Sequence, residues 1–310
     1  MTSRSPKRME LLRESLPYIR RFKGKTFVIK LSGKVTDSRD NLVSLAEEIA
    51  LFHQVGFRVV VVHGGGKQLS ELAEKLGVPQ TIVDGRRVTD APTLEIAKMV
   101  FAGKIRTDVL SALRGLGVRT VGLSGLDGDI IRARRRQLQK RLDRTTGREE
   151  LVDYGHVGDI VEIDGELLRL LLDQHYLPVV SSLGADDKGN VYNINADTIA
   201  SEIAVHLGAE KLILLSDVDG LLARVEDPSS KISYLSVSEV EGLLEEGRVA
   251  SGMIPKLTSI AASLRRGVAS AHIINGGRRN ALLQEVFTDQ GTGTMIGRGE
   301  AAESGDGNSK

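Results

Sequence analysis

The chain has 310 residues, of which 41% are hydrophobic and 27% charged, with a formal net charge of +1 and no cysteine. This length allows a sizeable core in one large domain or two lobes, and the near-neutral charge disfavours nucleic acid and other polyanions as general partners. Disulfides and thiolate sites are excluded, and the lack of a long apolar run predicts a cytoplasmic protein without a membrane partner.

Residues 1–24 predict a helical arm in front of the core. In the segment MELLRESLPYIRRF, Leu12, Leu16 and Ile19 form an apolar stripe, while Pro17 predicts that the helix kinks or divides. The stripe fits packing on the same subunit or on a neighbouring one, and its periodicity does not decide between these alternatives.

Strands and helices then alternate along the chain. The β-branched runs TFVIKLS and VVVVH predict buried strands, and each is followed by apolar residues at helical spacing. Further strands are expected at 120–125, 176–184, 211–220 and 270–276, and further helices at 93–115, 196–208, 254–266 and 279–287. This alternation predicts an α/β fold with an open, mainly parallel sheet sandwiched by helices.

Two segments depart from this alternation. The basic segment 132–150 predicts an exposed hairpin or loop, and its lack of interleaved aromatic residues argues against nucleic-acid binding. The polar segment 299–310 predicts a disordered tail.

The glycines Gly64, Gly65 and Gly66 connect the second strand to its helix. Such a turn presents backbone N–H groups and a helix N-terminus, which together attract anions. The segment nevertheless lacks the G-x-x-x-x-G-K-[ST] spacing of a P-loop, and GTGTMIG lacks that of a dinucleotide fingerprint. The glycines therefore predict an anion site of neither common type.

Several polar residues occupy the ends of other predicted strands or the starts of helices. Lys30 ends the first strand, Arg87 lies in a predicted turn, Asp217 ends a later strand, and Asp197 and Lys256 lie near helix starts. Ligands bind at the carboxyl ends of the strands in open α/β sheets. Each residue alone is more typical of a cap, a turn or the surface, so only the set indicates a site.

This set resembles the amino acid kinase family, most closely its acetylglutamate kinases, from about residue 11 to residue 296. The resemblance is carried by KTFVIKLSG, VVVHGGG, GRRVTD, VGLSGLDG, HYLPVVSSLG, NINAD, LLSDVDGLL, SGMIPK and FTDQGTGTMI. It implies the amino acid kinase fold, with an N-terminal lobe at 25–185 for acetylglutamate binding and dimerisation and a C-terminal lobe at 186–298 for ATP.

The resemblance also implies the chemistry. ATP phosphorylates the side-chain carboxylate of N-acetyl-L-glutamate in arginine biosynthesis, and Mg²⁺ is held by phosphate oxygens and water rather than by protein ligands. The carboxylate, with a reference pKa of about 4.3, is already ionised at neutral pH, so no general base is needed. The protein has to align the reactants and offset the charge on the transferred phosphoryl group.

By resemblance, Lys30 and Lys256 stabilise that charge and Asp197 orients both lysines. The implied acceptor-binding residues are Gly65, Gly66, Arg87 and Asn193. The implied ATP-binding residues are Gly33, Asp217, Val218, Asp219, Gly220, Leu221, Leu222, Gly252 and Met253.

The arm resembles the kinked helix that joins three dimers of arginine-inhibited acetylglutamate kinases into a hexamer. His272, Glu285 and Gly291 then fall at positions of the site for L-arginine, where a carboxylate would pair with the guanidinium. Gln290 replaces a usual acid there. The alternative is that Glu285 is a surface helix residue and His272 a core histidine.

Five further positions depart from the family, namely Ser32, Lys67, Arg86, Arg106 and Leu126. These departures leave the acceptor open, so a kinase for N-acetyl-aminoadipate or aspartate is an alternative. A second alternative is a non-catalytic, arginine-sensing kinase-like module.

Overall fold

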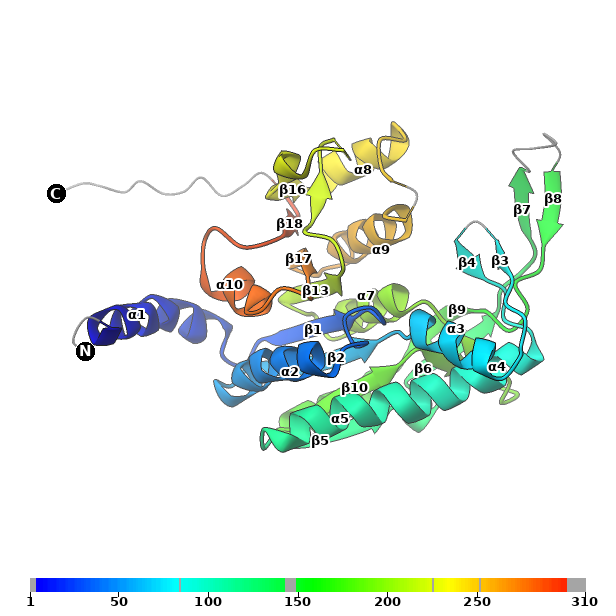
Figure 1. Cartoon of the computed structure of the whole chain (residues 1–310), viewed down its shortest axis with the longest axis horizontal. Coiled ribbons are helices and arrows are strands. Elements are labelled where there is room, and N and C mark those ends of the chain that lie inside the picture. The colour runs from blue at the N-terminus through cyan, green and yellow to red at the C-terminus, as the bar shows by residue number, and fades with distance from the viewer. Residues whose placement is uncertain (1–3, 84, 143–148, 225, 251, 300–310) are drawn as a thin grey trace.

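The central sheet runs through the whole molecule, as the computed structural model shows for residues 4–83, 85–142, 149–224, 226–250 and 252–299 (Figure 1). Its strand order is β16-β18-β17-β13-β1-β2-β10-β5, and all neighbours pair in parallel except β17 and β18. The strands are β1 (Thr26–Leu31), β2 (Arg58–His63), β5 (Thr120–Leu123), β10 (Leu177–Ser181), β13 (Lys211–Ser216), β16 (Tyr234–Ser236), β17 (Ser270–Asn275) and β18 (Thr294–Gly297). The predicted mainly parallel α/β fold is confirmed.

Helices cover both faces of this sheet, which explains why its inner strands are continuous apolar runs (Figure 1). In β1, Val28 contributes to the core beneath α7 and α9, while Phe27 and Ile29 contribute to the core beneath α2 and α5. The α-helices are α1 (Arg4–Phe22), α2 (Arg39–Gln54), α3 (Gly66–Lys75), α4 (Ala91–Lys98), α5 (Arg106–Gly115), α6 (Glu166–Asp173), α7 (Ala196–His206), α8 (Val237–Glu245), α9 (Ile254–Arg265) and α10 (Ala281–Phe287). Within the described residues, no helix is long and apolar enough to cross a membrane.

Smaller sheets flank the carboxyl edge of the main one. The largest has the order β12-β11-β6-β9, and antiparallel pairs join β3 to β4, β7 to β8 and β14 to β15. These strands are β3 (Ile82–Val83), β4 (Arg86–Arg87), β6 (Ile131–Arg135), β7 (Gln139–Leu142), β8 (Glu149–Val152), β9 (Gly158–Ile163), β11 (Leu183–Ala185), β12 (Val191–Asn193), β14 (Leu221–Leu222) and β15 (Lys231–Ile232). The hairpin predicted in the basic segment is therefore present as β7–β8.

The two predicted lobes, 25–185 and 186–298, share the central sheet. β1 of the first pairs in parallel with β13 of the second, with Lys30 opposite Leu214. This pairing brings the ends of strands that are far apart in sequence to one edge.

Pro17 was predicted to kink or divide the arm, and the arm forms one undivided helix that contains Pro17, so the division is excluded. The end of the helix is anchored in its own subunit, because Phe22 is buried and its ring contacts Phe27 edge-on at a centroid distance of 5.4 Å. Tyr18 is hydrogen-bonded to Asp289 beyond α10. The predicted tail falls almost entirely on residues 300–310, outside the described part of the chain.

The helix predicted at 93–115 consists of three segments. Between α4 and α5 lies a π-helix, η1 (Met99–Ile105), whose Phe101 and Ile105 are buried. A Cβ built on Gly65 would lie 2.2 Å from Ile105 Cδ1 and 2.9 Å from Phe101 Cδ1. The π-helix therefore packs directly behind the glycine loop, where π-bulges are often found near functional sites.

Candidate active site

Two lysines from opposite halves of the chain meet at one carboxylate. Lys30 Nζ lies 2.7 Å from Asp197 Oδ1, and Lys256 Nζ donates to Asp197 Oδ2 at 2.6 Å. Lys30 is near the carboxyl end of β1, Asp197 is in the first turn of α7, and Lys256 is in the first turn of α9. Asn195 Oδ1 caps α7 by accepting a hydrogen bond from the Asp197 amide at 2.8 Å. This cap fixes the backbone of Asp197, from which the carboxylate projects.

Burial makes these charges interact strongly. Lys30 is 6% exposed and Asp197 is 5% exposed. Burial lowers the pKa of Lys30, and Lys256 lowers it further, while the Asp197 charge opposes both effects. Burial raises the pKa of Asp197, but the two lysine charges outweigh it and hold that pKa at about 2. The result is an ionised cluster with one excess positive charge, which suits a phosphoryl group.

The glycine loop lies beside this cluster and is closely packed against the loop after β1. A Cβ on Gly33 would lie 3.2 Å from Gly65 Cα, and one on Gly64 would lie 3.5 Å from Ala196 Cβ next to Asp197. Gly66, in contrast, has no atom within 4 Å of its Cβ position and begins α3. A side chain is thus excluded at Gly65, and the loop lies next to the charged cluster through the contact of Gly64 with Ala196.

Arg87 and Asn193 are each held by hydrogen bonds to neighbouring elements. Arg87 lies in β4 and not in a turn as predicted. Its Nη2 donates to Gly66 O at 2.9 Å and to Ser70 Oγ at 2.7 Å, and burial lowers its pKa. Asn193 Nδ2 donates to Thr89 Oγ1 at 3.1 Å. Arg87 therefore reaches the glycine loop.

Most of the predicted ATP-binding residues, Asp217 to Leu222, directly follow the carboxyl end of β13. Asp217 pairs with Lys34 at 2.5 Å, and Asp219 accepts from Asn275 Nδ2 at 2.8 Å. Gly220 has a φ of +127°, and the following Leu221 amide donates to Thr294 Oγ1 at 2.8 Å. Val218 is 37% exposed and Leu221 is buried. Leu222 ends β14 and is partly exposed, and Gly252 and Met253 immediately precede α9. The turn between β13 and β14 is thus fixed at its end by Thr294, and its first residues remain accessible to a ligand.

The three residues of the predicted arginine site also meet. His272 Nδ1 lies 2.7 Å from Glu285 Oε1, and a Cβ on Gly291 would lie 2.9 Å from Glu285 Oε2. Both side chains are buried, so Glu285 is not a surface helix residue. Burial lowers the pKa of His272 to about 4, while the His272 and loop contacts outweigh burial and hold the pKa of Glu285 at about 2.

Sequence reasoning missed Lys211 in this second cluster. Its Nζ lies 2.9 Å from His272 Nε2 and 5.2 Å from the ring centroid of Phe22 in the arm. Burial lowers the pKa of Lys211 to about 8. The sequence did contain a signal for this residue, because Lys211 begins a strand whose other residues are all apolar or small.

The five departures from the family pattern fall in different environments. Lys67 pairs with Asp37 at the surface, and Arg86 and Leu126 are exposed. Ser32 follows β1, with its amide donating to Leu215 O at 3.2 Å. Arg106 lies against the sheet, since a Cβ on Gly122 would be 2.8 Å from its Cδ. The Arg106 side chain therefore packs against β5.

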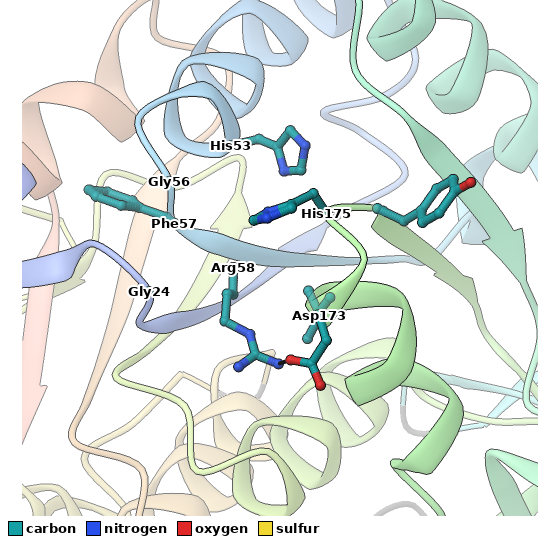
Figure 2. A pocket seen from close by; sticks show the side chains of 9 residues that line it. Gly24, His53, Gly56, Phe57, Arg58, Asp173 and His175 are labelled. Atoms are coloured by element: carbon teal, nitrogen blue, oxygen red, sulfur yellow. Dashed lines mark hydrogen bonds and ion pairs between the residues drawn. The ribbon is translucent and has the colours of Figure 1, made fainter.

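A separate hollow of about 190 Å³ lies at the opposite, amino end of the strands (Figure 2). His53 and His175 lie close together there, and below them Arg58 pairs with Asp173 at 2.6 Å. None of the lysines or glycines described above lines this hollow. The charged cluster at the carboxyl edge is the better candidate for chemistry.

A parallel α/β sheet that gathers two lysines, one carboxylate and a glycine loop at its carboxyl edge defines a phosphotransferase of the kinase class. Comparisons with known proteins agree. The amino acid kinase family matches residues 25–275. An acetylglutamate kinase of Methanocaldococcus jannaschii is 46% identical over 289 residues, covering 93% of this chain and 96% of that one. The chloroplastic acetylglutamate kinase of Arabidopsis thaliana is 44% identical, covering 93% and 80%.

Solved structures show the same fold. N-acetylglutamate synthase from Neisseria gonorrhoeae, complexed with coenzyme A and N-acetyl-glutamate, matches with a TM-score of 0.82 and 32% identity. The match covers 94% of this chain but only 64% of the synthase. Carbamate kinase from Giardia lamblia, at 19% identity and a TM-score of 0.63, shares the fold. The chain belongs to the amino acid kinase family and, within it, to the acetylglutamate kinases.

Proposed function

We propose that this enzyme uses ATP to phosphorylate the side-chain carboxylate of N-acetyl-L-glutamate, as a step of arginine biosynthesis. The observation that carries the proposal is the Lys30–Asp197–Lys256 cluster beside the glycine loop. The choice of acceptor rests on the acetylglutamate kinases that match nearly the full chain.

In the proposed reaction, a carboxylate oxygen of the acceptor attacks the γ-phosphorus of ATP. The bond from that phosphorus to the oxygen of the departing ADP breaks, leaving an acyl phosphate. Lys30 and Lys256 flank the transferred group and offset the charge on its oxygens, and Asp197 holds both ammonium groups at fixed positions. The Gly65 and Gly66 amides contribute neutral donors to the oxygens of the transferred phosphoryl group, where it meets the acceptor.

The nucleotide is assigned to the residues around the carboxyl end of β13, with Gly33, Asp217–Leu222, Gly252 and Met253. The site fits a nucleotide that brings its own Mg²⁺, because the Asp197 carboxylate is already taken by two lysines and Asp217 by Lys34. Bound to phosphate oxygens, Mg²⁺ would neutralise further charge on the triphosphate.

The proposed function is tested by a hydroxamate assay of the purified protein with ATP. N-acetyl-glutamate, N-acetyl-aminoadipate, aspartate and glutamate are compared as acceptors. The highest kcat/KM is expected with N-acetyl-glutamate. A higher value with another acceptor would replace the substrate, and ATP consumption with none of them would favour the arginine-sensing alternative.

Arg87 is assigned to the α-carboxylate of the acceptor, which gives a first prediction. Arg87→Ala is expected to raise the acceptor KM about 10- to 100-fold with little change in kcat, because a charge-assisted hydrogen-bond pair is lost. Arg87→Lys should not restore binding, since an ammonium cannot reproduce the planar pair. The exposed neighbour Arg86 is the matched control, and Arg86→Ala should leave the acceptor KM within about twofold. An unchanged KM in Arg87→Ala would contradict the assignment.

We further propose that L-arginine inhibits the enzyme at the cluster of His272, Glu285 and Gly291. Support comes from the position of the buried Glu285 carboxylate. Its cluster is connected to the arm by Lys211, whose ammonium group lies over the ring of Phe22. It also comes from the synthase of Neisseria gonorrhoeae, which has been solved in complex with L-arginine. Assembly into a hexamer through α1 and a cytoplasmic location are part of the same proposal.

Arginine inhibition gives a second prediction. Glu285→Gln is expected to weaken inhibition by L-arginine at least about 10-fold, because the guanidinium loses its carboxylate partner. Steady-state rates across an arginine titration measure the effect. Glu241→Gln, which changes an exposed carboxylate on α8 paired with Arg265, is the control and should remain as sensitive as the wild type. A wild-type enzyme that ignores millimolar arginine would reject the regulatory proposal and leave the kinase activity standing.

A further inference from the structure

We infer that His63 is a positioning residue that aims the N–H of Gly65 at the transferred phosphoryl group. The inference rests on the proposed kinase function and adds a residue that makes no contact with the phosphoryl group itself. It depends on three features: the face of the sheet on which His63 lies, the ring nitrogen that carries its proton, and the geometry of the peptide that follows.

His63 lies on the face of the sheet away from the lysine cluster. Side chains alternate along β2, and Val60 and Val62 belong to the core beneath α7, whereas Val59 and Val61 belong to the core beneath α2 and α5. His63 therefore points to the second face and is 0% exposed. By the same alternation in β1, Lys30 points to the face of α7, where it meets Asp197.

The hydrogen bond of His63 assigns its proton. His63 Nδ1 lies 3.2 Å from the carbonyl oxygen of Gly64. A carbonyl only accepts, so Nδ1 carries the hydrogen. The buried Nε2 has no partner among the described residues, which suits a bare nitrogen in a neutral ring. Burial lowers the pKa of His63 to about 4, and the Arg106 charge acts in the same direction.

Holding the Gly64 carbonyl fixes the Gly65 amide. In a trans peptide the C=O and the following N–H point in opposite directions across one rigid plane. His63 draws the Gly64 oxygen to its own face, so the Gly65 N–H points to the face of Lys30 and Asp197. Within the described residues this amide donates to no other backbone group, which leaves it for a ligand.

The preceding peptide is fixed by other groups. Ser182 Oγ donates to His63 O at 2.6 Å, and the Gly64 amide donates to Leu31 O at 3.0 Å. Glycine allows many backbone orientations, so the next peptide would be free to rotate without a side chain to hold it. His63 supplies that restraint, and Phe101 and Ile105 pack behind Gly65. A donor aimed in advance at developing charge accelerates transfer more than a donor that must reorient.

Two amide substitutions separate this role from simple packing. In Asn the side-chain NH₂ can take the place of Nδ1, whereas in Gln it takes the place of Nε2 and cannot reach the Gly64 oxygen in the same way. His63→Asn is expected to keep kcat within about fivefold of the wild type, and His63→Gln and His63→Leu to lose about 10- to 100-fold. The KM for ATP should change less than kcat, because the lost donor acts on the transferred group. Thermal unfolding of each variant measures the packing cost separately.

The overturning result is equal kcat in His63→Asn and His63→Gln at similar stability. A second measurement needs no substrate. Long-range ¹H–¹⁵N spectra of the histidine rings report the tautomer, and the His63 ring is assigned by the signal that is missing in His63→Asn. A neutral ring with hydrogen on Nδ1 is expected, and hydrogen on Nε2 or on both nitrogens would overturn the inference. A wild type that has the expected tautomer but fails to phosphorylate any acceptor would instead refute the proposed function.

Discussion

Replacing Lys30 or Lys256 with alanine is expected to lower kcat by about 100- to 1000-fold, the range found when one preorganised charge-stabilising donor is removed. The two ammonium groups approach the same carboxylate from β1 and from α9. In the proposed reaction each therefore offsets charge on a different side of the transferred group. Because the lysines act on the transition state, kcat should fall far more than the KM values rise. Steady-state kinetics with both substrates measures this split.

The double variant and a control sharpen that result. Residues that act as a unit are non-additive, so Lys30→Ala with Lys256→Ala should cost much less than the product of the two single losses. Lys25→Ala is the control, because Lys25 directly precedes β1 and forms only a loose, exposed ion pair with Glu210 at 3.9 Å. This variant should leave kcat unchanged. Nearly normal turnover of both single variants, with circular dichroism showing the native fold, would remove the lysines from the mechanism.

The sequence predicted the elements well because buried parallel strands leave a strong pattern. The run TFVIKLS became β1, and residues 59–63 fall within β2. Of the three glycines after β2, Gly65 lies where a side chain is excluded, because a Cβ built there would lie 2.2 Å from Ile105 Cδ1. The run of three glycines in the sequence could therefore locate this close approach of the backbone, which we propose as the anion-binding loop.

The contacts between distant residues could not be derived from periodicity. That Lys30 meets Asp197 depends on β1 lying between β2 and β13, which is a matter of strand order. The resemblance to a family assigned Lys30 and Asp197 to one site without any strand order, and the structure brings the two side chains together. The π-helix was missed because its pattern of apolar residues resembles that of an ordinary helix. Lys211 was missed because a lysine at a strand end is usually exposed, and here the ring of Phe22 covers it.

Replacing Asp197 with asparagine is expected to harm both stability and activity. The carboxylate is the shared counterion of two ammonium groups, and removing one member of a buried ion pair typically costs about 3–5 kcal/mol because a buried charge is left uncompensated. The free energy of unfolding, from urea denaturation, measures this loss. Asp173→Asn is the matched control, since Asp173 pairs with Arg58 at an exposed site and its loss should cost less than about 1 kcal/mol (Figure 2).

The same substitution should change the pH dependence of the rate. In the wild type, burial and Lys256 lower the pKa of Lys30 while Asp197 raises it. Asp197→Asn removes only the raising interaction, so the pKa of Lys30 falls further and the ammonium form is lost at a lower pH. The alkaline limb of the kcat profile should therefore move to lower pH, and kcat near neutral pH should fall about 100-fold. A variant with wild-type stability and an unshifted alkaline limb would show that Asp197 does not hold the charge of Lys30, and the charged cluster would lose its role in phosphoryl transfer.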